Sequence, residues 1–357
     1  MERFVSKSFS STHFLHNSLI ANLVGVRLAL ALLVMSLLAM PLLSGNAQAR
    51  DYQFFDAEIH YQDAKQATDG MDFLLENMEK ASIEKALITG FSVTKKWASS
   101  SPRRPFSYGA DDAPVYWYSA TDMLVYDAVK SLPEREQSRF YPFITGFNPT
   151  DLNAVDHIER LLKRDPGFWK GIGEVFTRHD LLSAMIEGER PLAHHPALMR
   201  VYQLAAKYGL PVMLHSNLTS PVMKEFIYLP ELELALETNP KTTFIWAHAG
   251  LSDAITLQQT VEGLPELVAE LLGKYQNLNI LLSWTVVDAL YDAEGVPKTD
   301  WLEVVKSYPN RFVIGSDVVG GFSPLKETMD HFRPFLDALP EEVAHRVAST
   351  NLLQWLP

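Results

Sequence analysis

Residues 210–217 read Leu210-Pro211-Val212-Met213-Leu214-His215-Ser216-Asn217, a short apolar run that ends in a histidine and two polar residues. Residues 244–250 repeat this pattern as Phe244-Ile245-Trp246-Ala247-His248-Ala249-Gly250. Apolar runs of this length predict strands that are buried on both faces, as in parallel sheets. We therefore expect two parallel strands that carry imidazole groups at the carboxyl edge of their sheet.

The same alternation of an apolar run and an amphipathic segment fills the rest of the chain after residue 50. Strands are predicted at 52–60, 85–90, 139–147, 169–176, 210–216, 242–247, 278–284 and 311–317. Helices are predicted at 70–81, 121–131, 151–163, 196–208, 221–237, 255–275, 299–307 and 324–336. Eight such units predict an α/β fold, a single (β/α)8 TIM barrel. A doubly wound open sheet is disfavoured, because no glycine-rich phosphate-binding sequence follows the first strand.

The first 49 residues have the order of regions found in an export signal. A polar, mildly basic segment precedes an apolar run from Leu28 to Leu43, and Ala47-Gln48-Ala49 then offers a cleavage site between small residues. The run is shorter than the ~20 residues that span a bilayer comfortably. We predict a signal peptide at 1–49 that is cleaved after Ala49, and a barrel domain at 50–357. The product would be periplasmic or secreted, without stable membrane insertion; a retained N-terminal anchor is the alternative.

Composition excludes several classes of protein. The chain has 357 residues with 31 Lys and Arg against 43 Asp and Glu, a formal charge of −12 without a basic tract. A nucleic-acid-binding protein is therefore disfavoured. The absence of cysteine excludes disulfides, thiolate metal sites and a cysteine nucleophile. Any metal ligands must be His, Asp and Glu.

Residues of these three types stand near the ends of five predicted strands. They are Glu58, His60, Glu174, His215, His248 and Asp317. In a barrel, the carboxyl ends of all strands meet at one mouth, so these six side chains would gather there. Mixed carboxylate and imidazole ligands suit a divalent ion such as zinc or manganese.

In this pattern the sequence resembles the amidohydrolase superfamily, in the group that includes aminocarboxymuconate-semialdehyde and resorcylate-type decarboxylases. The resemblance covers roughly residues 51–357 and includes Asn351-Leu352-Leu353, which is similar to the closing segment of the family. It implies roles for five of the residues. The implied metal ligands are Glu58, His60, His215 and Asp317, and His248 resembles the histidine that activates water or assists proton transfer.

Two acids leave the number of metal ions open. Glu58 stands where many members of the superfamily have a histidine, and this resembles the decarboxylase branch. Glu174 is similar to the acid that bridges two metals in deoxyribonuclease-like members, and it could equally be a hydrogen-bond partner of a ligand. The expected cofactor is one divalent ion, zinc or manganese, or two.

The function predicted first is an exported metal-dependent hydrolase. A metal-activated water would attack an amide, ester or lactone carbonyl of a small organic substrate, with His248 and Asp317 as catalytic residues. The alternative is a metal-dependent non-oxidative decarboxylase, a carbon–carbon lyase, and Glu58 is the main reason to keep it. A second alternative is a non-catalytic exported ligand-binding barrel. A homo-oligomer is left open.

Several further residues follow predicted strands without receiving a catalytic role. Arg178 and His179 could hold an anionic substrate group or form a solvated loop pair. Asn217, Ser283 and Trp284 could shape the pocket.

Overall fold

The computed structural model describes residues 50–95, 115–186 and 188–357, and Asp51–Pro357 form one compact unit. The predicted signal peptide at 1–49, with its cleavage site after Ala49, lies outside the described residues. Within the described part of the chain, none of the helices has the length and apolarity needed to cross a membrane.

Nine strands form one sheet in which every pair of neighbours is parallel. They are β1 (Phe54–His60), β2 (Ile83–Thr89), β5 (Phe140–Ile144), β6 (Gly171–Thr177), β7 (Val212–Ser216), β8 (Phe244–Ala247), β9 (Leu278–Leu282), β10 (Phe312–Ile314) and β11 (Val318–Val319). Their spatial order is β10-β9-β8-β7-β6-β5-β2-β1-β11. Each strand thus lies beside the neighbour expected from chain order.

The sheet closes through residues 312–319. The predicted eighth strand, 311–317, is a strand only at β10, and β11 follows it. The N–H of Gly315 donates to the carbonyl of Leu282 in β9 at 3.0 Å. Two residues later, the N–H of Asp317 donates to the carbonyl of Glu58 in β1 at 2.9 Å. One segment therefore joins both edges of the sheet, which is consistent with the predicted TIM barrel.

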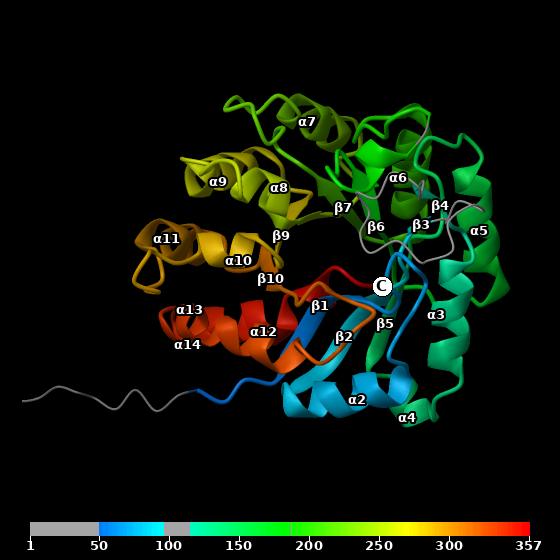
Figure 1. Ribbon diagram of the computed structural model, residues 1–357, viewed down its shortest axis with the longest axis horizontal. Coiled ribbons are helices and arrows are strands. Elements are labelled where there is room, and N and C mark those ends of the chain that lie inside the picture. The colour runs from blue at the N-terminus through cyan, green and yellow to red at the C-terminus, as the bar shows by residue number, and fades with distance from the viewer. Residues whose placement is uncertain (1–49, 96–114, 187) are drawn as a thin grey trace, which may run out of the picture. The chain divides into compact units, whose positions relative to one another are not determined.

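The helices that connect the strands lie outside the ring of strands (Figure 1). The longer ones are α2 (Met71–Lys80), α3 (Thr121–Lys130), α5 (Ala154–Arg164), α6 (Pro196–Tyr208), α7 (Leu229–Thr238), α9 (Leu264–Lys274), α11 (Thr299–Ser307) and α12 (Leu325–His331). The short ones are α4 (Glu134–Gln137), α8 (Asp253–Thr256), α10 (Val286–Ala289), α13 (Arg333–Asp337) and α14 (Glu341–His345).

Helix α6 has the predicted bounds, and its terminal residues explain why. The Nδ1 atom of His195 accepts the N–H of Ala197, and Pro196 occupies the first turn, where its missing N–H costs nothing. Gly209 ends the helix in the left-handed conformation at φ 67°.

Three predicted helices are wrong in extent, and the cause is local chemistry. The segment 221–237 is a loop up to α7, held by Gln259 Nε2, which donates to carbonyls of this loop. The segment 255–275 is broken between α8 and α9, where Gly263 has a φ of 72°. The segment 324–336 divides into α12 and α13, with Pro334 in the first turn of the second helix.

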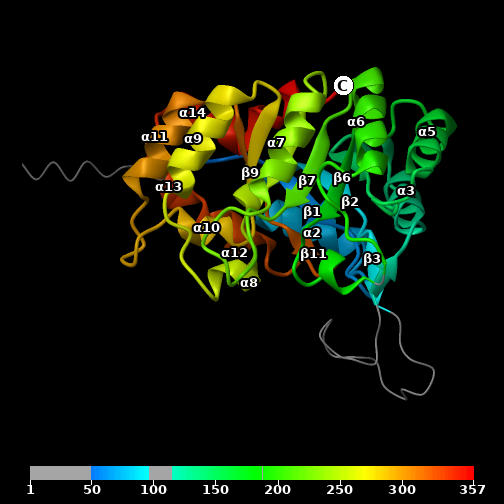
Figure 2. The same cartoon turned by 90° about the horizontal axis from the view of Figure 1, so that it is seen from above.

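Two apolar layers pack the barrel. The outer layer lies between strands and helices, and the inner one fills the barrel with Phe55, Ala57, Leu87, Phe143, Met213, Ile245, Ala247, Leu281, Val313 and Leu352. A small antiparallel hairpin, β3 (Val93–Lys95) with β4 (Val115–Trp117), was not predicted. Figure 2 shows β3, α8 and β11 at one end of the barrel and the C-terminus at the other.

Candidate metal centre

The structure brings all six predicted site residues to one end of the barrel. Glu58 and His60 lie on β1, Glu174 on β6, His215 on β7, His248 directly after β8, and Asp317 between β10 and β11. Their ligand atoms form three overlapping trios, each with its atoms within 4.8 Å of one another: Glu174–His215–His248, Glu58–His60–Glu174 and Glu58–His248–Asp317. All are buried except Asp317, whose side chain is 11% exposed.

The pairing of β1 with β2 explains why Glu58 faces this site. Between Asp56 and Ile59, two residues of β1 oppose one residue of β2, which is a β-bulge. Ala57 packs in the barrel interior, and Glu58, the next residue, also turns toward the centre. Asp56 does not join them, because its Oδ1 accepts the N–H groups of Glu58 and Ser316.

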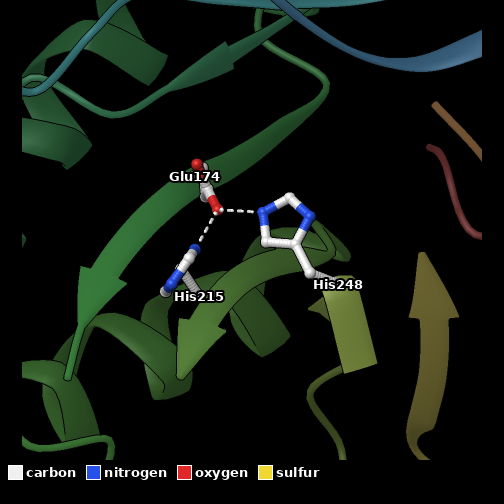
Figure 3. A group of neighbouring side chains, drawn as sticks. All are labelled: Glu174, His215 and His248. Atoms are coloured by element: carbon white, nitrogen blue, oxygen red, sulfur yellow. Dashed lines mark hydrogen bonds and ion pairs between the residues drawn. The ribbon is translucent and has the colours of Figure 1, made fainter. Parts of the chain in front are cut away.

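Glu174 is the centre of the cluster. Its Oε1 lies 2.9 Å from His215 Nδ1 and 3.3 Å from His248 Nε2 (Figure 3). Its Oε2 lies 3.3 Å from His60 Nε2, and this same nitrogen is 3.2 Å from Asp317 Oδ1. Three imidazole nitrogens thus face carboxylate oxygens.

The other nitrogen of each imidazole faces a hydrogen-bond acceptor. His60 Nδ1 donates to the carbonyl of Gly90 at 2.9 Å. His215 Nε2 donates to Oδ1 of Asn217 at 3.0 Å. A neutral imidazole carries one proton, so these outer bonds leave the lone pair of each ring on the nitrogen that faces the cluster.

His248 is held by a hydroxyl group in the same way. Ser283 Oγ donates to Glu58 Oε2 at 2.8 Å, because an ionised carboxylate only accepts. The hydroxyl oxygen then accepts the Nδ1 proton of His248 at 2.9 Å. The lone pair of His248 therefore lies on Nε2, the atom nearest Glu174.

This arrangement fits a divalent cation. Inward lone pairs and carboxylate oxygens repel one another in a buried site unless positive charge lies between them. The other oxygen of Glu58, Oε1, is buried and has no hydrogen-bond partner among the described residues. Nitrogen and oxygen donors in this number suit zinc or manganese.

The pKa values of the cluster describe its protonation in the absence of a metal ion. Burial raises the pKa of Glu58 well above its usual range, and the charges of Asp317 and Glu174 add to this. Burial lowers the pKa of His248, but the negative charges around it, Glu58 first, outweigh burial and raise it to about 9. Burial also lowers the pKa of His60, but its hydrogen bonds to Asp317 and Glu174 outweigh burial and raise that pKa well above its usual range. A metal ion that binds His60 would therefore release a proton.

Backbone strain gathers at this end of the barrel. Arg178, His248, Trp284 and Asp317, which follow four different strands, have φ between 50° and 57°. Such left-handed conformations are costly for residues with a side chain, and they persist where surrounding structure imposes them, often at functional sites.

A cavity of about 240 Å³ opens over the cluster. Apart from the cluster itself, its lining is aromatic or apolar with one further imidazole: Phe91, Phe176, His179, Leu181, Leu182, Trp284 and Val319. Drug-sized ligands occupy cavities of roughly 300–1,000 Å³, so this one suits a smaller molecule.

His179 is a site residue for which the sequence left two interpretations open, a group that holds an anionic substrate or a solvated loop residue. Its ring stacks on His215 with centroids 4.4 Å apart, and its Nδ1 accepts the N–H of Leu181 at 3.2 Å. The proton therefore lies on Nε2, which makes His179 a neutral hydrogen-bond donor in the lining of the cavity. Its place directly after the strand at 171–177 was the available signal. Arg178, by contrast, is paired with Glu231 and lies over the ring of Tyr228.

Comparison with solved structures reveals similar folds. A 2,6-dihydroxybenzoate decarboxylase from Rhizobium matches with a TM-score of 0.53 and 13% identity, over 85% of this chain and 98% of that one. An uncharacterised TIM-barrel protein from Bordetella bronchiseptica matches with 0.53 and 13%, over 85% and 97%. A dihydroxybenzoic acid decarboxylase from Polaromonas sp. JS666, with bound manganese and the inhibitor 2-nitroresorcinol, matches with 0.51 and 12%, over 85% and 97%.

Neither a protein-family model nor a curated protein matches the sequence. At identities of 12–13% the structural likeness concerns the fold. The fold of this chain therefore matches that of TIM-barrel proteins, two decarboxylases among them.

Proposed function

We propose that this protein is a divalent-metal-dependent enzyme that removes carbon dioxide from a small aromatic carboxylic acid without oxidation. The observation that carries the proposal is a set of inward-facing donor atoms beneath a small cavity with aromatic walls. The similar folds also support decarboxylation over the hydrolysis predicted first, since one of those enzymes is solved with 2,6-dihydroxybenzoate and another with manganese and 2-nitroresorcinol.

In this proposal Glu58, His60, His215 and Asp317 would hold the ion, as the resemblance in the sequence implies. His248 and Glu174 contribute donor atoms to the same three trios. When bound, a divalent ion polarises the oxygen atoms of a carboxylate and a neighbouring hydroxyl group. Manganese and zinc both accept this donor set.

The cavity walls would orient the substrate ring. Phe91, Phe176 and Trp284 offer apolar faces and edges against which a planar ring packs favourably. His179 Nε2 offers a proton to a carboxylate or phenolic oxygen of the substrate. The low polarity of these walls also strengthens the hydrogen bonds that the protein makes to the substrate oxygens.

The chemical step needs one proton at the ring carbon that bears the carboxylate. His248, when protonated on Nε2, or the Asp317 carboxyl group would deliver it, and both residues line the cavity. The new C–H bond forms, the bond to the carboxylate carbon breaks, and its electron pair stays with the ring as carbon dioxide leaves. Asp317 is the most exposed member of the cluster, so it is suited to regain a proton from water. No oxidant or reductant is consumed.

Hydrolysis remains the second candidate, and Glu174 is the observation that favours it. Its two oxygens face different trios of donors, one with His60 and one with His215. A carboxylate placed in this way could bridge two metal ions, and two-metal sites are typical of hydrolases.

The experiment measures bound metal and product in one preparation. Protein reconstituted with manganese is incubated with 2,6-dihydroxybenzoate and other hydroxybenzoates, and carbon dioxide release is followed together with metal content. We expect about one ion per chain and metal-dependent carbon dioxide release from at least one of these acids. Two ions per chain with cleavage of aryl esters or lactones, and no carbon dioxide release, would contradict decarboxylation in favour of hydrolysis.

A further inference from the structure

We propose that Asp180 and Asn217 form a relay that sets the tautomer of His215 and links the cavity wall to the metal centre. Asp180 lies in the loop after β6, and Asn217 directly follows β7. This inference rests on the metal dependence proposed above, but it does not depend on which reaction the metal serves.

Asp180 determines which end of the Asn217 amide faces it. Asp180 Oδ2 accepts a proton from Ser252 Oγ at 2.5 Å and another from Asn217 Nδ2 at 2.7 Å. A carboxylate has lone pairs and no proton to give. Turning the amide over would place Asn217 Oδ1 against Asp180 Oδ2 at this same distance, with two sets of lone pairs in contact.

The amide in turn determines where His215 carries its proton. With its nitrogen facing Asp180, Asn217 presents Oδ1 to His215 Nε2 at 3.0 Å. This oxygen only accepts, so the proton of the ring lies on Nε2. The lone pair is then on Nδ1, which lies 2.9 Å from Glu174 Oε1 inside the cluster.

His215 needs such a relay and the other two histidines do not. His60 donates to a backbone carbonyl, which cannot change into a donor. His248 donates to Ser283, whose own proton is committed to Glu58. Asn217 is different, because an amide has an acceptor end and a donor end that are nearly equal in shape. A turned amide would favour the tautomer of His215 with a proton on Nδ1, which removes the lone pair from the cluster.

The relay also reaches the substrate cavity. Asp180 lies between His179 and Leu181, and both neighbours line the cavity. The N–H of Leu181 donates to His179 Nδ1 within the same loop. One carboxylate therefore anchors part of the cavity wall and orients a residue beside the metal. Asp180 and Asn217 act through His215, which makes them positioning residues.

Asp180→Asn is the direct test, because an amide at position 180 can donate as well as accept and no longer forces the orientation of Asn217. Removal of such a hydrogen-bond partner typically weakens metal binding by roughly 10–100-fold. We expect the dissociation constant for Mn²⁺, measured by titration calorimetry, to rise by about that factor. The unfolding temperature of the metal-free protein should change little, which separates this role from a structural one.

Two more variants separate the orientation of the Asn217 amide from other effects of Asp180. Ser252→Ala removes the hydroxyl group that donates to Asp180 and accepts from Asn217 Nδ2 at 3.3 Å. The shorter bond from Asn217 Nδ2 to Asp180 remains and keeps the amide orientation, so Mn²⁺ affinity should stay within about twofold of wild type. Asn217→Ala should weaken binding about as much as Asp180→Asn. Because both act through His215, the double variant should lose no more than either single variant.

The tautomer itself can be observed in protein loaded with diamagnetic Zn²⁺ and ¹⁵N-labelled histidine. The ¹⁵N spectrum of wild type should show the His215 proton on Nε2, and the signal is assigned by its absence from His215→Gln. In Asp180→Asn this signal should disappear or be accompanied by the signal of the other tautomer. Wild-type Mn²⁺ affinity in folded Asp180→Asn, or an equal loss in Ser252→Ala, would overturn the relay. A wild-type protein that binds no metal would overturn relay and proposed function together. Metal binding with the expected losses but without decarboxylation would contradict only the proposed reaction.

Discussion

Ser283 lies between two members of the cluster and sets the orientation of both. Its hydroxyl group donates to Glu58 Oε2 and accepts from His248 Nδ1, two atoms that lie 3.9 Å apart. One oxygen of Glu58 is thereby occupied, and Oε1 is left to face a cation. Ser283 is 225 positions from Glu58 along the chain, so a strand pattern alone does not reveal that these side chains meet.

Ser283→Ala should lower kcat by roughly tenfold or more, because Glu58 Oε2 loses its donor and His248 Nδ1 keeps only the longer contact with the backbone carbonyl of residue 283, at 3.3 Å. Ser283→Thr retains the hydroxyl group and should restore most of the activity. Steady-state kinetics of the manganese-loaded enzyme, beside the unfolding temperature, checks this. Equal activity of the alanine variant and wild type would show that His248 needs no fixed tautomer.

At the scale of single elements, the observed bounds of the strands agree with the bounds predicted from the sequence more closely than those of the helices do. The apolar run at 212–216 stops where polar residues begin, and the observed strand lies within two residues of the predicted start. Helical periodicity, in contrast, continues across Gly263 and Pro334, although the backbone there cannot continue the helix.

The residues of the site that end strands could be predicted from the sequence, and those in loops could not. Residues such as His215 and His248 end apolar strands, and parallel strands bring their carboxyl ends together. Their hydrogen-bond partners lie elsewhere: Asn217 and Asp180 are in loops after strands. Loop conformation depends on contacts between distant segments, and no local pattern encodes it.

Gly315→Ala tests the closing element of the barrel. A β-carbon at this position would lie 2.9 Å from Glu58 N and 3.0 Å from Glu58 Cβ, so β1 would have to shift. Overpacking of this kind typically costs about 1–3 kcal/mol, and it should also weaken metal binding through Glu58. Urea unfolding measures the loss of stability, and Gly273→Ala in α9, which meets only the hydroxyl end of Tyr308, is the control. A Gly315→Ala protein as stable as the control would contradict close packing at this junction.

Helix α3 is tied to the barrel by a buried acid that makes stability depend on pH. Asp122 accepts the N–H groups of Thr145 and Gly146, but burial outweighs these bonds and raises the pKa of Asp122 to about 7. The folded protein therefore binds a proton that the unfolded chain has already lost. Between about pH 4 and pH 7, the free energy of unfolding should fall as pH rises.

Asp122→Asn keeps an acceptor oxygen and removes the charge. Relative to wild type, this variant should gain stability as pH rises from 5 to 8, by about 3 kcal/mol. Urea unfolding at several pH values measures the difference, and Asp127→Asn, an exposed acid of the same helix, serves as the control. A difference between wild type and Asp122→Asn that stays constant with pH would show that Asp122 is ionised throughout.

At the scale of the whole molecule, both ends of the folded unit contribute to closing the barrel. β1 pairs with β11, and the buried Asn351 donates from Nδ2 to the carbonyls of Pro309 and Phe312, each at 2.8 Å. This side chain ties the C-terminal segment to the residues that enter β10. Asn351 therefore has a structural role at the C-terminal end of this chain.

The predicted signal peptide at 1–49 makes export of the whole molecule testable. If residues 1–49 are a signal peptide, protein recovered from the periplasm or medium should begin at Arg50, as N-terminal sequencing would read. Loss of those residues would change the formal charge from −12 to −14, because Arg3, Lys7, Arg27 and Glu2 are removed. Recovery of only full-length protein in the membrane fraction would favour the anchor instead.

The central claim is that the buried cluster holds a divalent cation. Its most direct test is the metal content of the purified protein after reconstitution with Mn²⁺ or Zn²⁺ and removal of free ions, measured beside a Glu58→Gln/His215→Ala double variant. We predict about one tightly bound ion per wild-type chain and strong depletion in the variant. Wild-type protein that retains no more metal than the variant would contradict the claim.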